Sequence, residues 1–101
     1  MVSSPIEDAV IQYVIEQAKA AFHAPKVVLF GSRASGNHQP RSDYDIAVSI
    51  DSTEASKWPA FALAIAEGAP TLKGIDLINY NDCSATLKER IDREGITVYG
   101  G

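Results

Sequence analysis

Three aspartates stand in segments where the sequence predicts β-strands, and their spacing could bring acidic side chains together. Asp43 and Asp45 are two residues apart in the segment 43–50, which alternates between apolar and polar positions. Side chains two apart on a strand leave the same face, about 7 Å apart along the backbone. Asp76 interrupts a second apolar segment, 72–80. An ionised carboxylate without a partner there would cost several kcal/mol, so we expect something positive to compensate it.

The positive partner of these carboxylates could be a basic side chain, water at a strand edge, or a metal ion. For one aspartate alone, an ion pair or a water-facing strand edge is a sufficient explanation. No lysine or arginine occurs within 45–50 or 75–80, however, and three carboxylates on two neighbouring strands favour a divalent cation. Ligands that are all oxygen suit Mg²⁺ or Mn²⁺ better than Zn²⁺, which prefers histidine or cysteine.

A glycine and a serine directly follow another short apolar segment and could bind an anion. Gly31 and Ser32 come after 26–30, and a strand that ends in a glycine turn and opens a helical turn presents backbone amides and a hydroxyl to a phosphate. The next residue, Arg33, could clamp a phosphate or lie in solvent. The lysine-bearing P-loop and the G-x-G-x-x-G fingerprint are absent from the sequence. The turn alone therefore leaves both interpretations open.

A helix near the start of the chain is predicted from its capping residues and its apolar spacing. Ser4 can cap the helix, Pro5 suits the first helical position, and Glu7 completes a capping box. Apolar residues then recur every three or four positions up to Ala21, which predicts a helix with one apolar face that ends before Pro25.

Strands and helices alternate along the rest of the chain. The expected strands are 26–30, 43–50, 72–80 and 96–99. A helix that contains Trp58 and Phe61 should end at Gly68, and a last helix capped by Asp82 or Ser84 should end at Gly95. Residues 34–42 have loop-forming composition and are expected to connect without packing. This connection is too short for a crossover, which makes the first two strands antiparallel. The predicted fold is α/β with α+β character, a small mixed β-sheet with helices packed on it.

Length and charge limit what the protein can be. The 101 residues predict one domain, 1–101, with little material for walls around a large substrate. A net charge of −4 with scattered basic residues argues against a track for nucleic acid. The sequence has one cysteine, Cys83, and shows no signal peptide and no apolar run long enough to span a membrane, so we expect a cytoplasmic protein.

Taken together, the residues with chemical potential resemble a known motif. The motif consists of Gly31, Ser32, ten intervening residues, Asp43, Asp45 and the later Asp76. It resembles that of the DNA polymerase β superfamily of nucleotidyltransferases. The short form, with Gly-Ser-Arg-Ala and Ser-Asp-x-Asp, resembles the minimal nucleotidyltransferase (MNT) family in particular. The likeness extends over residues 27–99 and includes the closing segment 87–99.

The resemblance implies a polymerase β-type nucleotidyltransferase fold, with a roughly five-element mixed sheet and helices packed on it. It also implies that Asp43 and Asp45 bind two Mg²⁺ ions, for which Mn²⁺ could substitute, and that Asp76 joins the second metal. In that scheme Asp76 is placed to take a proton from the acceptor.

The same resemblance implies a nucleotide site. Ser32 and the turn at Gly31 would hold the β- and γ-phosphates of a nucleoside triphosphate, and Arg33 is a further nucleotide-binding candidate. The reaction would be nucleotidyl transfer with release of pyrophosphate. Dehalogenase-like phosphotransferases and nucleotide-sugar glycosyltransferases also use Asp-x-Asp, but their pair sits at a strand end and their chains are far longer.

MNT proteins are typically encoded beside a small helical HEPN protein, and some pairs are toxin and antitoxin. By resemblance we expect a protein adenylyltransferase that moves AMP from ATP to a HEPN-type partner, with an antitoxin-like role. The contact could involve the first helix or the segment with Trp58 and Phe61, although both suit the core better. Two alternatives stay open, a catalytically silent module that neutralises its partner by binding, and transfer to a small molecule. The base specificity and the oligomeric state are left open as well.

Overall fold

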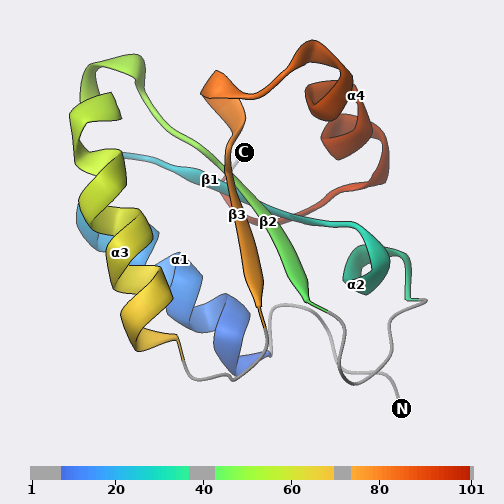
Figure 1. Cartoon of the computed structure of the whole chain (residues 1–101), viewed down its shortest axis with the longest axis horizontal. Coiled ribbons are helices and arrows are strands. Elements are labelled where there is room, and N and C mark those ends of the chain that lie inside the picture. The colour runs from blue at the N-terminus through green and yellow to red at the C-terminus, as the bar shows by residue number, and fades with distance from the viewer. Residues whose placement is uncertain (1–7, 37–42, 70–73, 101) are drawn as a thin grey trace.

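The computed structural model describes residues 8–36, 43–69 and 74–100 (Figure 1). Its helices are α1 (Ala9–Ala21), α2 (Ser32–Ser35), α3 (Trp58–Gly68) and α4 (Ala85–Glu94), with short 3₁₀ helices η2 (Ser52–Lys57) and η3 (Tyr80–Asp82). Its strands are β1 (Lys26–Phe30), β2 (Tyr44–Ser49), β3 (Ile75–Asn79) and β4 (Ile96–Tyr99). None of the helices in these ranges is long and apolar enough to cross a membrane.

The four strands form one mixed sheet in the order β3-β2-β1-β4. β1 runs antiparallel to β2 and to β4, whereas β2 and β3 are parallel. The predicted antiparallel pairing of the first two strands and the mixed sheet are therefore confirmed. The four strands of the described residues lie within the segments predicted from the sequence pattern, and they form the mixed sheet that the resemblance implies.

Helices cover both faces of the sheet (Figure 1). α1 and α3 pack on one face, where the alternate residues of β2 meet them as predicted. These core residues of the second strand and its end are Tyr44, Ile46, Val48 and Ile50. α4 covers part of the opposite face through a second, smaller cluster made by Val28, Phe30, Ala47 and Ile91. β2 is thus buried on both faces, but polar side chains remain at its beginning.

The start of α1 differs from the prediction. The helix begins at Ala9, and Asp8 is its N-cap, because the Asp8 Oδ1 accepts hydrogen bonds from the amides of Val10 (2.8 Å) and Ile11 (3.4 Å). The expected cap at Ser4 and its capping box lie outside the described residues. Asp8 also accepts a hydrogen bond from the Tyr44 hydroxyl at 2.7 Å, which ties the helix start to β2. Burial and this hydrogen bond raise the pKa of Tyr44 to about 12.

The connection after β1 also differs from the prediction. Residues 34–42 were expected to connect without packing, but Ala34 belongs to the turn α2 and packs against the main core. The turn at Gly31 starts this short helix, and the packing of Ala34 keeps the helix against the sheet. Residues 37–42 lie outside the described part of the chain, as do 70–73 at the beginning of the third predicted strand.

The ends of α3 and α4 agree with the sequence, whereas the predicted strand 72–80 is shortened, because Tyr80 begins η3. Of the two candidate caps of α4, Ser84 takes the role, since its Oγ accepts a hydrogen bond from the Leu87 amide at 3.2 Å, and Gly95 ends the helix. Phe61 is 3% exposed and packs edge-on against Phe22, 5.1 Å between ring centroids. This aromatic residue is therefore core and not available for a partner.

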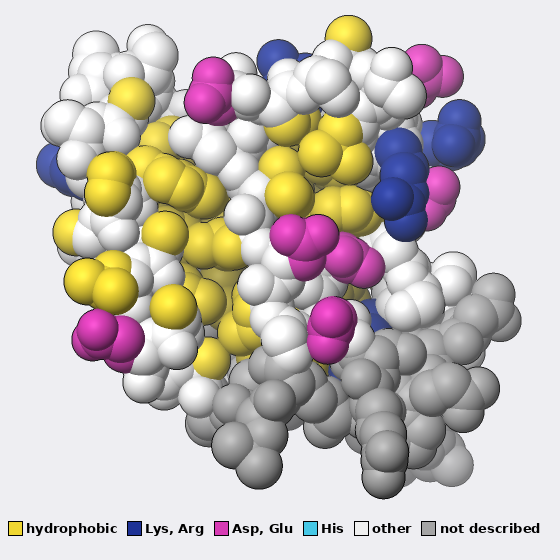
Figure 2. Space-filling model, viewed as in Figure 1, with side chains coloured by type: hydrophobic (Ala, Val, Ile, Leu, Met, Phe, Trp, Pro, Cys, Tyr) yellow, Lys and Arg dark blue, Asp and Glu magenta, His cyan; other side chains and the backbone are white. Residues whose placement is uncertain are grey.

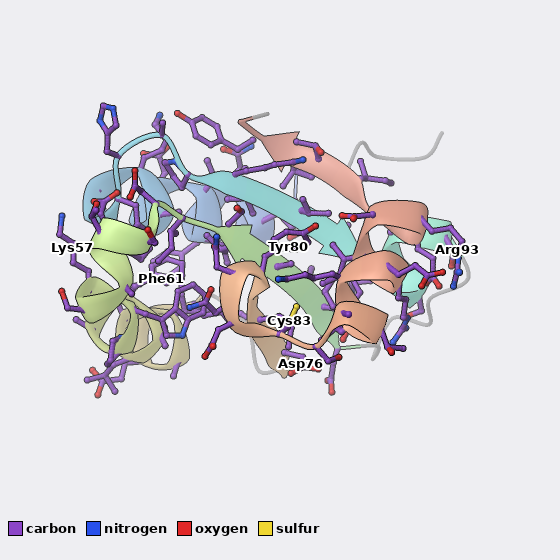
Figure 3. The ribbon with its side chains drawn as sticks, turned by 90° about the horizontal axis from the view of Figure 1, so that it is seen from above. Lys57, Phe61, Asp76, Tyr80, Cys83 and Arg93 are labelled. Atoms are coloured by element: carbon purple, nitrogen blue, oxygen red, sulfur yellow. The ribbon has the colours of Figure 1, made fainter. Side chains whose placement is uncertain are left out.

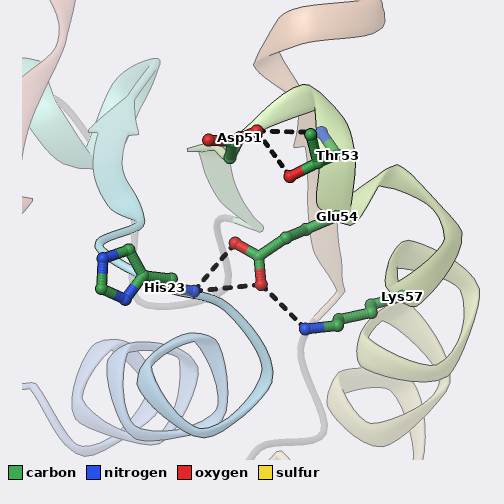
Figure 4. A network of polar contacts seen from close by, with 5 residues as sticks. All are labelled: His23, Asp51, Thr53, Glu54 and Lys57. Carbon is green, nitrogen blue, oxygen red and sulfur yellow. Dashed lines mark hydrogen bonds and ion pairs between the residues drawn. The ribbon is translucent and has the colours of Figure 1, made fainter.

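A buried carboxylate joins the end of α1 to the segment before α3 (Figure 4). Glu54 of η2 accepts hydrogen bonds from the backbone amide of His23, at 2.9 and 3.2 Å, and from the Lys57 ammonium at 2.9 Å. The hydrogen bond from Lys57, followed by that from His23, lowers the pKa of Glu54. Without these two donors, the Glu54 carboxylate would be a buried charge without a partner.

The Glu54 network predicts a pH-dependent contribution to stability. Because the folded-state pKa lies below the ordinary value, the stabilisation is present above pH 4.5, the usual value for glutamate, and is lost as the pH falls through the folded-state pKa. In urea unfolding, Glu54→Gln should be less stable than the parent chain at neutral pH, and the difference should shrink on acidification. Glu16→Gln, at an exposed helix position, is the control and should change little at any pH. A constant difference for Glu54→Gln down to about pH 3 would contradict the assignment.

Candidate active site

The parallel pairing of β2 with β3 brings together two of the predicted carboxylates. Asp45 and Asp76 are direct partners in the register. Because partners across a strand pair point to the same face, both side chains leave the sheet on the side opposite to Tyr44. Asp45 is half-buried and Asp76 is exposed, at the margin of the sheet that β3 forms (Figure 3). The two neighbouring strands that the sequence predicted for these residues are therefore adjacent in the structure.

The third carboxylate, Asp43, is held at the entrance to β2 by a glycine. The Asp43 Oδ1 accepts a hydrogen bond from the Gly74 amide at 3.1 Å, and the Gly74 carbonyl accepts one from the Tyr44 amide at 2.9 Å. A Cβ added to Gly74 would lie 3.0 Å from the Asp43 Cγ. Gly74 was not recognised as a site residue from the sequence. A glycine immediately before an apolar strand is the only local signal, and it is a common one.

The charges of Asp76 and Asp43 act on the carboxylate of Asp45. Burial and the adjacent Asp76 raise the pKa of Asp45, and Asp43 adds to the effect, whereas the nearby Arg90 opposes it. Figure 2 shows acidic side chains gathered near the middle of this face, over the beginnings of β2 and β3, with basic side chains beside them over α4. Neighbouring carboxylates of like charge repel one another, and a cation between them would relieve the repulsion.

The oxygen atoms of the three carboxylates suit a hard divalent cation. Within the described ranges, no group of three or more histidine, cysteine, aspartate or glutamate side chains is arranged to hold a metal ion as it stands. Asp43, Asp45 and Asp76 nevertheless lie close enough for their charges to couple, and they offer only oxygen atoms. All-oxygen donors fit Mg²⁺ or Mn²⁺.

Gly31 lets the turn after β1 approach this carboxylate group closely. Phe30 at the end of β1 is the register partner of Asp45, so Gly31 emerges beside that carboxylate. Gly31 has φ 74°, and a Cβ there would lie 2.2 Å from the Asp45 Oδ2. The Gly31 carbonyl accepts hydrogen bonds from the amides of Ala34 (3.1 Å) and Ser35 (3.2 Å), and Ser32 is the first residue of the helical turn that these bonds close. The Gly-Ser turn and the carboxylates are thus neighbours.

Arg33 points away from the carboxylates. Its guanidinium lies 3.9 Å from the centroid of the Tyr44 ring, a distance typical of a cation–π contact. Since Tyr44 and Asp45 are consecutive on β2, their side chains lie on opposite faces of the sheet. The structure therefore brings Gly31, Ser32 and the carboxylates to one place but does not join Arg33 to them, and a phosphate contact by Arg33 stays a prediction.

A second arginine, which the sequence analysis did not single out, lies beside the carboxylates. Arg90 of α4 has its guanidinium 5.6 Å from the Phe30 ring centroid, lowers the pKa of Asp45, and forms an ion pair with Glu94 at 3.4 Å. Phe30 and Asp45 are adjacent across the β1–β2 pair. α4 thus brings a positive charge to the carboxylate side of the sheet. No local pattern in the sequence reveals this position, because it depends on how α4 packs.

Comparison with known proteins places this geometry in context. The model of the family described as "Polymerase beta, Nucleotidyltransferase" matches residues 12–101. A protein named protein adenylyltransferase MntA, from Aphanizomenon flos-aquae, is 33% identical over 86 residues, which cover 72% of this chain and 55% of the relative. The chain therefore spans about half the length of this curated relative.

Solved structures with the same fold include toxin–antitoxin complexes. One, a toxin–antitoxin crystal structure with AMP-PNP, superposes with a TM-score of 0.64 at 25% identity, over 89% of this chain and 73% of the other. Another, described as a tri-AMPylated Shewanella oneidensis HEPN toxin in complex with MNT antitoxin, gives a TM-score of 0.56 at 20% identity, over 89% of this chain and 69% of the other. The second likeness concerns the fold alone.

The contact between Gly31 and Asp45 predicts an unusually costly glycine substitution. Gly31→Ala would combine a strained positive φ with a clash against the Asp45 carboxylate, so we expect a loss of about 2–4 kcal/mol in the free energy of unfolding. Gly36→Ala is the matched control, because Gly36 has φ 81° but a Cβ there meets nothing within 4 Å. It should lose only about 1–2 kcal/mol. Urea denaturation measures both, and equal losses would contradict the close contact.

Proposed function

The chain belongs to the polymerase β nucleotidyltransferase family, and on this basis we propose that it is a Mg²⁺-dependent nucleotidyltransferase that moves AMP from ATP to a hydroxyl group of a HEPN-type partner protein. The observation that carries the proposal is the in-register pair of Asp45 and Asp76 beside the turn at Gly31. The name of the relative, protein adenylyltransferase, and the AMP-PNP in a similar complex support ATP as the substrate.

In this proposal the three aspartates hold the metal and position the reacting groups. Asp43, Asp45 and Asp76 would bind two Mg²⁺ ions, with Mn²⁺ as a substitute. Bound ions of this kind neutralise a triphosphate and lower the pKa of an attacking hydroxyl. Asp76 is exposed on the β3 side of the site. We therefore propose that it contacts the acceptor and removes the proton of the acceptor hydroxyl.

The remaining site residues bind the nucleotide. The turn at Gly31 and the hydroxyl of Ser32 would hold the β- and γ-phosphates, and Arg90 would supply positive charge from α4. The acceptor oxygen then forms a bond to the α-phosphorus while the bond from that phosphorus to the bridging oxygen breaks. The electron pair of the broken bond leaves with pyrophosphate, and the acceptor proton goes to Asp76.

The partner is proposed from the resemblance to MNT proteins and from the toxin–antitoxin complex with AMP-PNP. A helical HEPN protein would supply the acceptor and the second wall that a small domain lacks. We place the reaction in the cytoplasm, where thiols such as that of Cys83 stay reduced.

Loss of one metal-binding carboxylate tests the proposal. Purified protein is incubated with labelled ATP, Mg²⁺ and a HEPN protein from the same genome, and transfer of AMP is followed by mass. Asp45→Asn should lower the rate by more than about a hundredfold, because it removes a charge that holds the metal. Chelation by EDTA should have the same effect.

The control for this test is Asp82→Asn, at an exposed aspartate of η3. It should keep the parent rate. If Asp45→Asn protein neutralised the partner in cells as fully as the parent chain, the catalytically silent binding module would be the correct reading. AMP transfer to small alcohols but not to the HEPN protein would instead favour a small-molecule acceptor.

Arg90 provides a separate prediction about nucleotide binding. Arg90→Gln removes the positive charge beside Asp45, so the KM for ATP should rise about tenfold with a smaller change in kcat. Arg93→Gln is the matched control, since Arg93 lies on the same helix but pairs with Glu89 and Glu94 in an exposed position. A KM that is unchanged in Arg90→Gln protein would remove Arg90 from the nucleotide site.

A further inference from the structure

An apolar cleft runs beside the carboxylates, between α3 and the edge of the sheet. Figure 2 shows the trough of hydrophobic side chains that separates α3 from β3. The cleft has a volume of about 470 Å³, and its lining includes Ala62, Ile65 and Ala66 of α3 with Ile75, Asp76 and Leu77 of β3. Asp76 thus belongs to the strand that borders the cleft, between two residues with apolar side chains.

β3 is an edge strand of the described sheet, because it pairs with β2 on one side only. An edge strand presents unpaired N–H and C=O groups, which suit an extended peptide. The side chains of β3 alternate across the sheet, so Ile75 and Leu77 face the cleft next to α3 whereas Asp76 faces the carboxylate side. A strand added to this edge would alternate in the same way.

From this arrangement we propose that β3 and α3 form the docking site for the acceptor segment of the partner, which pairs with β3 as an additional extended strand. The inference rests on the proposed function and specifies how the acceptor is presented. The residue opposite Asp76 would point to the same face as Asp76, with its Cβ about 5 Å away. Its two neighbours in sequence would point into the cleft. The segment recognised is therefore a hydroxyl-bearing residue with an apolar residue on each side.

Charge indicates a further property of the segment. Asp43, Asp45 and Asp76 make this end of the sheet acidic, so lysine or arginine near the acceptor residue would be attracted to it. β4, the other edge strand of the described sheet, lies on the far side of β1 from these carboxylates. A segment bound at β4 would have its hydroxyl remote from Asp76, so the β3 edge is the one that fits an acceptor.

Peptide binding without ATP tests the docking site independently of catalysis. The probe is a short synthetic peptide in which valines flank a central tyrosine and lysines form both ends. On titration into ¹⁵N-labelled protein, we expect amide shifts at 75–79 and at Ala62 and Ala66. Replacing the two valines by serine should weaken binding about tenfold or more, because the cleft then loses its apolar contacts.

Two tryptophan variants of α3 provide the matched comparison. Ala66→Trp fills the cleft and should weaken peptide binding about tenfold. Ala60→Trp, at another exposed alanine on the same helix that lines a different cleft, should leave binding unchanged. Asp76→Asn protein should still bind the peptide while it transfers no AMP, which separates docking from chemistry.

The outcomes are distinguishable. Peptide binding at β3 without AMP transfer by the parent chain would support the docking site and count against the proposed function. Three results would overturn the docking site: no shifts at 75–79, shifts at β4 instead, or the same shifts on concentrating the protein alone, which would assign the edge to a second copy of the chain.

Discussion

Electrostatic repulsion between Asp45 and Asp76 is the constraint on which the site depends. The parallel pairing of β2 and β3 places these two carboxylates side by side, and burial of Asp45 strengthens their interaction. Like charges directly opposite each other on paired strands destabilise a sheet unless something compensates them. A bound divalent cation, as proposed above, would relieve this repulsion.

The neighbouring elements bring further residues to this pair of carboxylates. β1 brings Gly31 against Asp45, Gly74 holds the Asp43 carboxylate, and α4 brings Arg90 to the same side. On the opposite face, Tyr44 packs in the core, donates a hydrogen bond to Asp8 and lies against the guanidinium of Arg33. The carboxylates of the proposed site therefore lie on one face of the sheet, and most of the core lies on the other.

Much of this could be predicted from the sequence, because strand alternation and the Gly-Ser to Asp-x-Asp spacing are local patterns. Burial of alternate residues of β2 followed from the alternation of 43–50, and the antiparallel pairing of the first two strands followed from a short connection. Gly74 and Arg90 were missed because their roles arise from contacts between distant segments. The direction of Arg33 was not predictable either, since it depends on the ring of Tyr44. Local capping rules suggested Ser4, whereas Asp8 caps the described helix through its Oδ1 and accepts a hydrogen bond from the Tyr44 hydroxyl through its Oδ2.

The contact between Gly31 and Asp45 couples the two positions. The carboxylate oxygen occupies the space that a side chain at position 31 would fill, 2.2 Å from an added Cβ. The two positions therefore share a single volume, and neither can become larger unless the other retreats. A change at either position therefore requires a compensating movement at the other, whereas residues around them can change independently of this contact.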